Sequence, residues 1–319
     1  MRPHPLQQQR GVAVLMALLI VTIATLAVSA MLWRQQVQLR ALENRLALTQ
    51  ARALALSAID WARLVLWEDL NLPGRAAYDH PNEAWAVTLA ETRIADGEGN
   101  DSREAYVSGR IRDESGKLNA LDLVQTGKVN ERAVREFERL AEALQLDLNL
   151  AEALAEALVQ TQEQAPAQAG GKVQAPQALP AIRWEDLAQR AGLNPEQADR
   201  FSPHVAILPK QTNMPTTPIN ANSASAEVLY ARIDALSLAQ SRALATARDR
   251  IELRNTGDIE TVTRVSGLTA RLAGVDVRSE YFRIEARVRY GRALSTVEAL
   301  VWRAPASQDK PHLLWSHEL

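Results

Sequence analysis

The stretch GVAVLMALLIVTIATLAVSAMLW, residues 11–33, contains neither a charged residue nor a proline. As a helix it would extend about 35 Å, at about 1.5 Å per residue, which exceeds the ~30 Å hydrocarbon core of a bilayer. It has no polar face, unlike the surface helices of soluble proteins. We therefore expect a transmembrane helix at residues 12–33. A cleaved signal peptide that ends at the small residues 27–30 is the alternative interpretation.

A short polar leader, MRPHPLQQQR, precedes the apolar stretch, and the polarity changes abruptly at Gly11. This arrangement resembles a type III signal, in which prepilin peptidase cleaves after the glycine and methylates the new N-terminal residue. The resemblance implies cleavage between Gly11 and Val12. A glycine suits this position because a residue without a side chain lets the backbone enter a protease site closely. Arginines flank both ends of the stretch, so the positive-inside rule does not determine its orientation.

The helix is expected to continue beyond the membrane to about residue 72. Apolar residues from Val37 to Leu64 recur mainly at spacings of three and four, with Arg and Gln between them. Pro73 and Gly74 then end the pattern. A long helix that is half apolar and half amphipathic has the shape of a pilin backbone helix, whereas a coiled-coil stalk would need a stricter heptad repeat.

Four segments with alternating apolar and polar residues predict an antiparallel sheet. Residues 85–94 and 105–113 flank a turn-forming segment, ADGEGND. Residues 281–290 and 293–303 alternate more regularly and are joined around Gly291, which predicts a hairpin. Because the two pairs are far apart in the sequence, we expect one sheet that is interrupted by an insertion.

The segment between the strand pairs, residues 115–275, is expected to be mainly helical. Within it, residues 161–180 are rich in Gln, Ala, Pro and Gly without periodicity, which predicts a mobile loop. Amphipathic stretches predict helices at residues 131–146, 150–160, 185–192, 225–233 and 238–252.

Two motifs in the second half of the chain carry a family resemblance. DESGKLNALDL, residues 113–123, resembles an Asp-x-x-Gly-x-x-Asn segment of the K-type minor pseudopilins of bacterial type II secretion systems, the general secretion pathway protein K family. PINANSASAEVLYA, residues 218–231, resembles the second signature of that family. The returning strand YFRIEARV and a final strand that ends at Arg303 follow in the expected order. The resemblance covers essentially the whole chain.

The resemblance implies an α+β fold of the pilin type, with a long N-terminal transmembrane helix, an antiparallel sheet and a large helical insertion domain similar to SAM and helix-hairpin-helix domains. The expected parts are a prepilin-type leader at 1–11, a transmembrane segment at 12–33, the periplasmic part of the helix at 34–72, the sheet at 73–114 and 276–319, and the inserted domain at 115–275.

The fifth residue after the expected cleavage site is Met16, whereas most pilins carry Glu there. A carboxylate within a bilayer is costly unless it has a partner, which in pilin-like fibres is the N-terminal amine of the neighbouring subunit. K-type subunits are known for lacking this Glu, which fits a position at the tip of the fibre. The resemblance thus implies a tip subunit that assembles with I-type and J-type minor pseudopilins, other pseudopilins and the inner-membrane secretion platform.

The location and role follow from the same resemblance. We expect a single-pass protein of the bacterial inner membrane with the bulk of its chain in the periplasm, which supports export of folded proteins across the outer membrane. The apolar face of residues 12–33 would pack against partner helices.

The polar residues of the two motifs are expected to have a structural role, because Asn and Ser side chains bond nearby backbone groups and cap helices. Ser225 or Ser223, with the following Glu, would start a helix at Ala226. The residues of this capping motif are Asn119, Asn220, Asn222, Ser223 and Glu227.

A membrane-anchored helix-hairpin-helix protein for DNA binding or uptake is the alternative function, because INANSASAEVL, residues 219–229, also opens such domains. That chemistry needs glycines whose backbone amides hold a phosphate. The sequence IDALS, residues 233–237, has no glycine and adds an acid. The net charge of −2 also disfavours nucleic acid as a partner.

An enzyme is not expected, and no residue is assigned a catalytic role. The five His residues are scattered, without an HExxH or Gly-x-Ser-x-Gly motif. The chain has no cysteine, which excludes a disulfide, a thiolate metal site and a Cys nucleophile.

Calcium is the one cofactor that the resemblance suggests, because K-type relatives can hold calcium in the helical domain. The corresponding loop, LVQTQEQAP at residues 158–166, offers Glu163 and amides, whereas a hard cation needs several anionic or carbonyl oxygens. A second group of oxygen ligands lies between the first two predicted strands, where a solvated turn is the alternative. The candidate ligands there are Asp96, Glu98, Asn100 and Asp101.

Overall fold

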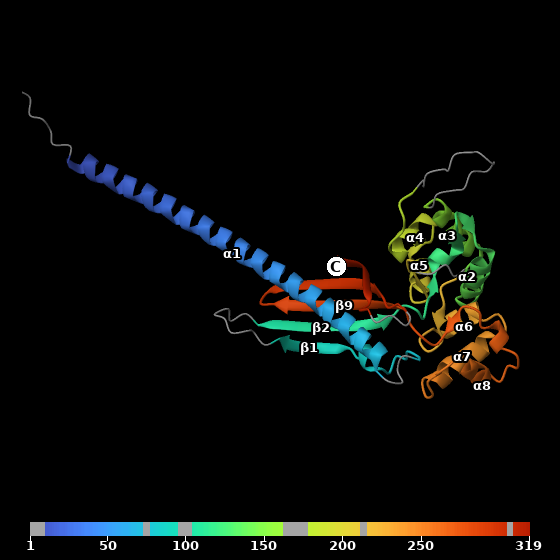
Figure 1. Cartoon of the computed structure of the whole chain (residues 1–319). Helices are drawn as coiled ribbons and strands as arrows, with labels where there is room; N and C mark the ends of the chain where they lie inside the picture. The colour runs from blue at the N-terminus through green and yellow to red at the C-terminus, as the bar shows by residue number, and fades with distance from the viewer. Residues whose placement is uncertain (1–9, 73–76, 95–103, 162–177, 211–215, 305–308) are drawn as a thin grey trace, which may run out of the picture.

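The computed structural model describes residues 10–72, 77–94, 104–161, 178–210, 216–304 and 309–319. Its longest element is helix α1, Arg10–Asn71, which projects far beyond the rest of the molecule in Figure 1. The sequence from residue 12 to residue 72 holds neither glycine nor proline, so nothing in it interrupts a helix. A single helix therefore carries both the predicted membrane segment and the segment that packs on the sheet.

The second half of α1 packs on the sheet through a row of mostly small residues. These residues recur at spacings of three or four, which places them on one face of the helix. Their small side chains let the helix lie close against the strands that it crosses, β9 (Tyr281–Tyr290) and β10 (Ala293–Trp302). The buried row consists of Ala47, Ala51, Ala55, Ile59, Ala62 and Leu66.

The described residues form a five-stranded antiparallel sheet in the order β1-β2-β9-β10-β11. Gly291, at φ +57°, and Arg292 form the turn between β9 and β10, because Tyr290 and Ala293 are paired. The antiparallel sheet and the long helix confirm the predicted α+β fold class. The other strands are β1 (Leu89–Ile94), β2 (Ala105–Asp113) and β11 (His312–Glu318).

Two details of the sheet differ from the sequence-based prediction. Ala84–Ala86 form a 3-10 turn, η1, where a strand was expected, and this turn buries Trp85 edge-on against Phe282 with ring centroids 5.2 Å apart. Strand β1 consequently begins only at Leu89. The strand that ends beside Arg303, β10, is not the last strand of the sheet, because β11 follows it in the chain and pairs with it.

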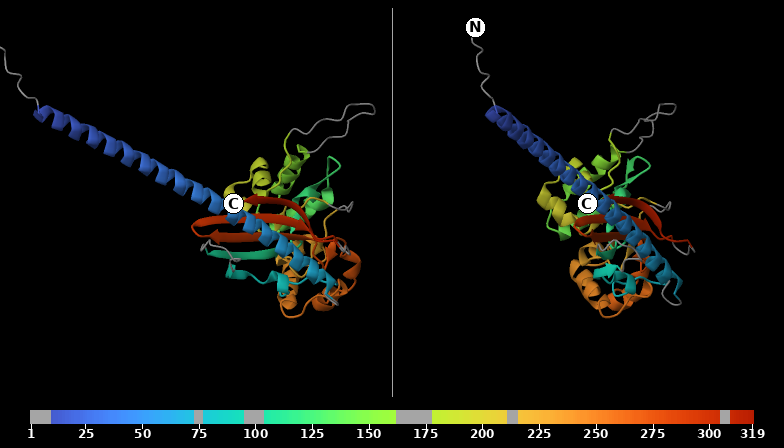
Figure 2. Two further views of the ribbon diagram at one scale, coloured as in Figure 1. Left: turned by 60° about the vertical axis from the view of Figure 1, so that its left-hand side comes forward. Right: turned by 90° about the vertical axis from the view of Figure 1, so that its left-hand side faces the viewer.

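A helical domain lies between β2 and β9 in the sequence, and Figures 1 and 2 place it at the end of the sheet remote from the N-terminal half of α1. Helix α5 was not predicted, although Asn194 and Gln197 form a capping box with Pro195 at the first position. The helices are α2 (Glu131–Ala143), α3 (Asn149–Val159), α4 (Trp184–Arg190), α5 (Pro195–Phe201), α6 (Ala226–Arg232), α7 (Leu238–Arg248) and α8 (Gly257–Thr263).

Short elements connect these helices. Two 3-10 turns, η2 (Ala120–Leu123) and η3 (Thr269–Arg271), lie near the two ends of the domain's sequence. Three two-residue strand pairs complete the domain: β3 (Leu118–Asn119) with β6 (Val205–Ala206), β4 (Val124–Gln125) with β5 (Lys128–Val129), and β7 (Ile219–Asn220) with β8 (Val275–Asp276).

The described residues bury two large hydrophobic cores. One core lies between α1 and the sheet and includes Trp85 and Phe282, and the other lies within the helical domain and includes Phe137 and Phe201. The chain leaves the sheet at the end of β2 and returns at the start of β9, where Asp113 and Phe282 are paired neighbours. Polar side chains gather at this crossing point between the two cores.

Candidate functional site

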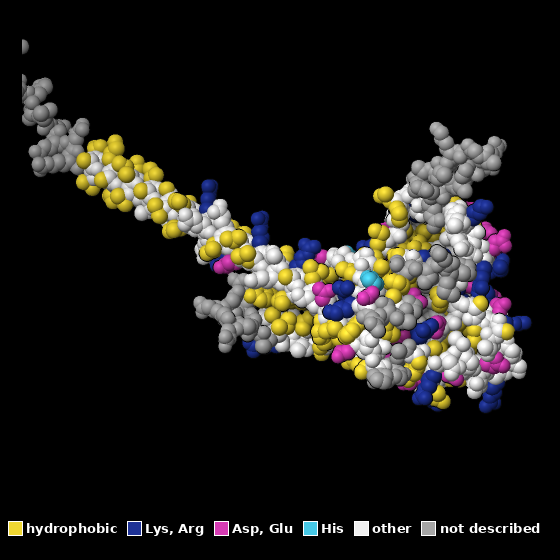
Figure 3. Space-filling view, in the orientation of Figure 1, with side chains coloured by type: hydrophobic (Ala, Val, Ile, Leu, Met, Phe, Trp, Pro, Cys, Tyr) yellow, Lys and Arg dark blue, Asp and Glu magenta, His cyan; other side chains and the backbone are white. Residues whose placement is uncertain are grey.

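The N-terminal half of α1 exposes its apolar side chains all along its length. Each large apolar residue from Val12 to Trp33 is more than half exposed, Met16 among them at 59%. Among the described helices, α1 alone is long and apolar enough to cross a membrane, by length and composition. Figure 3 shows hydrophobic side chains covering the visible face of this free part of the helix. Gly11 lies within the first turns of the same helix.

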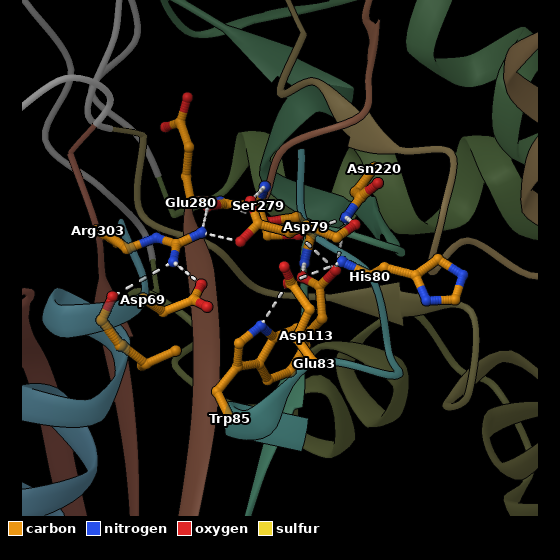
Figure 4. A network of polar contacts seen from close by, with 12 residues as sticks. Asp69, Asp79, His80, Glu83, Trp85, Asp113, Asn220, Ser279, Glu280 and Arg303 are labelled. Atoms are coloured by element: carbon orange, nitrogen blue, oxygen red, sulfur yellow. Dashed lines mark hydrogen bonds and ion pairs between the residues drawn. The ribbon is translucent and has the colours of Figure 1, made fainter. Parts of the chain in front are cut away.

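A second candidate site is a buried polar network where α1, the sheet and the helical domain meet, shown in Figure 4. Its members come from segments far apart in the sequence: the last turn of α1, the segment before η1, the end of β2, β7, the segment before β9 and the end of β10. We call it the polar junction, and it consists of Asp69, Asp79, Glu83, Asp113, Asn220, Ser279 and Arg303.

Arg303 ties together three parts of the polar junction. Its guanidinium, 4% exposed, forms ion pairs with Asp79 and, at 3.4 Å, with Asp69. It also donates a hydrogen bond of 3.1 Å to the backbone carbonyl of Ser279. Asp79 in turn accepts a hydrogen bond of 2.7 Å from the Ser279 amide. The end of β10 is thereby held to α1 and to the segment that leads into β9.

Asp113, the last residue of β2, is half-buried, and its carboxylate is surrounded by donors. It accepts hydrogen bonds from the Ser115 amide at 2.7 Å, from the Ser279 hydroxyl at 2.5 Å and from the Ser223 hydroxyl. Burial raises the pKa of Asp113 to about 6, although the hydrogen bonds from Ser223 and Ser279 oppose that rise. Its position explains the first Asp of the sequence motif, because it joins the sheet to the residues around Asn220.

The two Asn residues of the second motif hold segments of the helical domain in place. The Asn220 side chain donates to Ser279 at 2.7 Å and to the Asp79 carbonyl at 3.1 Å. The Asn222 side chain forms a pair of hydrogen bonds with the backbone of Leu253, at 2.8 and 3.0 Å. Both side chains are almost completely buried, and their hydrogen bonds satisfy polar groups of segments that lie far apart in the sequence.

The remaining motif residues are also placed at segment ends. The Asn119 side chain caps η2 through the Leu121 amide and bonds both the amide and the carbonyl of Leu208. Ser225, and not Ser223, caps α6, since its hydroxyl accepts a hydrogen bond from the Val228 amide.

Glu227 and Ser223 therefore have other roles than the expected cap of α6. Glu227 lies in the first turn of α6, where the helix dipole favours a negative charge. Ser223 instead donates to Asp113. Its neighbour Gly116 leaves room for it, because a Cβ atom on Gly116 would come within 2.6 Å of the Ser223 hydroxyl.

The polar junction contains three carboxylates whose oxygens lie within 4.8 Å of one another, those of Asp69, Asp79 and Glu83. A hard cation would need these oxygens free. Arg303 already bonds Asp69 and Asp79, and Glu83 accepts hydrogen bonds from the Trp85 indole at 2.8 Å and the His80 amide at 3.0 Å. This donor set does not fit calcium.

The calcium candidates named from the sequence lie outside the described residues. These are Asp96, Glu98, Asn100, Asp101 and Glu163.

Sequence patterns missed most of the polar junction, although one signal was present. Asp69 continues the spacing of the buried row of α1, three residues after Leu66, so a carboxylate on the buried face of the helix was visible in the sequence. A buried carboxylate needs a cationic or donor partner. No pattern identified Arg303 as that partner, because it meets Asp69 only in the fold.

A helix that exposes an apolar half, a pilin-like sheet and a helical domain inserted between two paired strands define a membrane-anchored, pilin-type protein. Two family models match the chain, at residues 116–210 and 219–278, and both describe protein K of the type II secretion system. Over these two segments the chain is similar to the type II secretion system protein K family.

Two similar proteins agree with the family. Type II secretion system protein K of Pseudomonas aeruginosa is 29% identical over 298 residues, which cover 89% of this chain and 85% of that protein. A chain in the crystal structure of the GspK-GspI-GspJ complex from the type 2 secretion system of enterotoxigenic Escherichia coli shares the fold, with a TM-score of 0.62 and 17% identity. That match covers 85% of this chain and 96% of the other. These matches give no support to the DNA-binding alternative.

Proposed function

We propose that this chain is a minor pseudopilin that caps the tip of a periplasmic pseudopilus and supports export of folded proteins across the outer membrane. The observation that carries the proposal is the joint presence of two protein K matches in one helical domain and of a helix whose apolar half is exposed. The protein acts by assembly and not by catalysis. Nucleic acid is not among its partners.

Processing of the N-terminus prepares the chain for assembly. Prepilin peptidase removes the leader after Gly11, and Val12 becomes the methylated N-terminus. Val12 opens an uninterrupted apolar helix, so the mature chain stays in the inner membrane while the rest lies in the periplasm.

The partners are the I-type and J-type minor pseudopilins, followed by other pseudopilins and the inner-membrane secretion platform. The similar protein from Escherichia coli was crystallised in a complex with GspI and GspJ, which supports this choice. Met16 in place of the usual Glu fits a subunit with no neighbour above it, and the inserted helical domain adds bulk that suits a tip and not a shaft.

The test is the intact mass and N-terminal sequence of the membrane-extracted protein, from hosts with and without prepilin peptidase. A peptidase-dependent N-terminus at Val12 with one added methyl group is the expected result. Loss of substrate export on deletion of this chain, restored by its re-expression, completes the test. A chain that begins after Ala30, or that keeps Met1 in both hosts, would reject the proposal.

A further inference from the structure

The face of the sheet opposite α1 forms one side of a polar cleft. Phe282 and Ile284 of β9 belong to the core between α1 and the sheet, so Arg283 between them points to the opposite, outer face. On that outer face, residues 205–208 of the helical domain pack against Leu300 of β10. A cleft of about 280 Å³ remains between the outer face and the helical domain, and we call it the outer cleft.

The floor of the outer cleft is a row of side chains from four neighbouring strands. Arg112 of β2 is paired with Arg283 of β9. Arg283 is paired with Leu300 of β10, which is paired with Trp315 of β11. Like charges directly opposite one another on paired strands repel. Arg112 and Arg283 therefore both need a compensating negative charge.

Arg283 obtains its compensation within the molecule, whereas Arg112 does not. The Arg283 guanidinium donates to Glu114 at 3.1 Å and to Glu298 at 3.3 Å, and Glu114 also pairs with Lys117 at 3.0 Å. Among the Lys, Arg, Asp and Glu side chains that line the outer cleft, Arg112 alone forms no ion pair or hydrogen bond with the described residues. The outer cleft therefore offers one uncompensated guanidinium.

The indole nitrogen of Trp315 is a second unused donor at the outer cleft. This nitrogen is buried and has no hydrogen-bond partner within the described part of the chain. A buried N–H group without an acceptor is unfavourable. The Trp315 residue as a whole is only half-buried, and the second side-chain torsion of Trp is broad, so a small rotation turns the N–H group into the cleft. A ligand with an acceptor there would satisfy it.

The positions of these two donors indicate a peptide and not a small ion. Strands β2 and β11 are three strand spacings apart, which is about 14 Å at ~4.8 Å per spacing. An extended peptide covers this distance with about four residues, at ~3.3 Å each. A phosphate group carries close to two negative charges and would lie near Glu114 and Glu298. A single carboxylate instead matches the one free guanidinium in charge and in geometry.

We propose that the outer cleft binds a short, extended segment of another protein that carries one acidic side chain. The carboxylate of this segment pairs with Arg112, and a backbone carbonyl of the same segment accepts a hydrogen bond from the Trp315 indole. The inference goes beyond the proposed function and does not depend on it.

NMR of the full-length chain in detergent micelles, with isotope-labelled tryptophan, tests the proposal. The chain has seven Trp residues, and Trp315→Phe identifies the indole signal of position 315. The probe is the pentapeptide Ala-Ala-Glu-Ala-Ala with both ends blocked, and the control is the same peptide with Gln in place of Glu. We expect the Glu peptide to move the Trp315 signal downfield in a saturable manner. The Gln peptide should bind about tenfold more weakly or less, because it lacks the charge.

Two arginine variants locate the acidic side chain of the probe. Arg112→Gln should weaken binding of the Glu peptide about tenfold or more and abolish its advantage over the Gln peptide. Arg287→Gln is the matched control and should leave binding unchanged. Arg287 is exposed on the same outer face and forms no ion pair within the described residues, but it does not line the outer cleft. Unchanged positions of the other indole signals establish that each variant is folded.

Four outcomes overturn the proposal. Three of them are a Trp315 signal that does not move, an equal response to the Glu and Gln peptides, and an equal loss of binding in the two arginine variants. Inorganic phosphate is titrated separately. If phosphate moves the Trp315 signal and saturates at a lower concentration than the Glu peptide, the outer cleft is a site for a free anion and not for a peptide.

Discussion

The carboxylate of Asp113 joins the sheet to the helical domain. Its ionisation should therefore change the free energy of unfolding. Its pKa is raised to about 6, so the protonated form is favoured in the folded protein. The resulting stabilisation is complete below the unfolded-state pKa near 4 and is lost as the pH rises through about 6. Above that pH the buried carboxylate is charged and relies on its hydrogen bonds.

The pH dependence can be isolated with Asp113→Asn, which cannot titrate. As the pH falls from 7 to 5, we expect the free energy of unfolding of the wild type to rise by about 1 kcal/mol relative to this variant. Denaturant unfolding of the detergent-solubilised chain at both pH values measures the difference. A difference that is independent of pH would contradict the burial of a titrating Asp113.

Gly116 is a position where space, and not backbone conformation, requires glycine. A Cβ atom there would lie 2.6 Å from the Ser223 hydroxyl, 2.8 Å from the Ser223 carbonyl carbon and 3.0 Å from the Ala224 amide nitrogen. Because two of these atoms are backbone, they cannot move away cheaply. We expect Gly116→Ala to destabilise the fold by about 1–3 kcal/mol, measured by chemical denaturation.

Gly257→Ala is the control, because its Cβ atom would meet only the end of the Asn255 side chain. Its free energy of unfolding should stay within about 0.5 kcal/mol of the wild type. If the two substitutions lowered the free energy of unfolding equally, the close contact with Ser223 would not be the cause of the loss.

At the scale of elements, the ends of α1 and β10 are connected by the ion pairs of Arg303. Removal of the guanidinium in Arg303→Met leaves the carboxylates of Asp69 and Asp79 buried without their cation. We expect a loss of about 3–5 kcal/mol in the free energy of unfolding. Addition of Asp79→Asn to this variant should recover part of the loss, because one uncompensated charge is removed. Thermal and denaturant unfolding of both variants provide the measurement.

The elements that sequence patterns predicted well are those fixed by local or periodic signals. The uninterrupted α1 and the hairpin around Gly291 are of this kind, since the first lacks breakers and the second alternates regularly on both sides of a turn. Strand β11 was missed because HLLWSHE is short and only partly alternating, and its partner strand supplies the pairing.

The candidate sites were also predictable only where local or periodic signals determine them. The exposed apolar half of α1 was predictable because burial in lipid needs only composition and length. The Asn and Ser residues of the motifs were recognised as structural, yet Ser223 bonds a carboxylate more than a hundred positions away rather than a helix end. Contacts of this kind arise from tertiary structure, which local propensity does not encode.

For the whole molecule, we propose that the position of the chain in an assembly depends on residue 16. A Glu introduced by Met16→Glu would face the bilayer without the neighbouring amine that satisfies it in a fibre shaft. We expect about tenfold or greater loss of the chain from membrane complexes that contain its partners, measured by quantitative immunoblotting after mild extraction. Met16→Leu, which conserves apolar volume, should leave the amount unchanged. Undiminished assembly of the Glu variant would argue against the tip position.

Because Asp113 pairs with Phe282, the chain leaves the sheet at the end of β2 and returns to it directly opposite, at the start of β9. A short turn could connect the same two strands, so the strand order of the sheet does not depend on which segment is inserted between them. Such an architecture lets the inserted domain be enlarged, trimmed or reshaped without shifting any strand of the sheet. The accessory domain and the shared pilin scaffold are therefore free to diverge at different speeds.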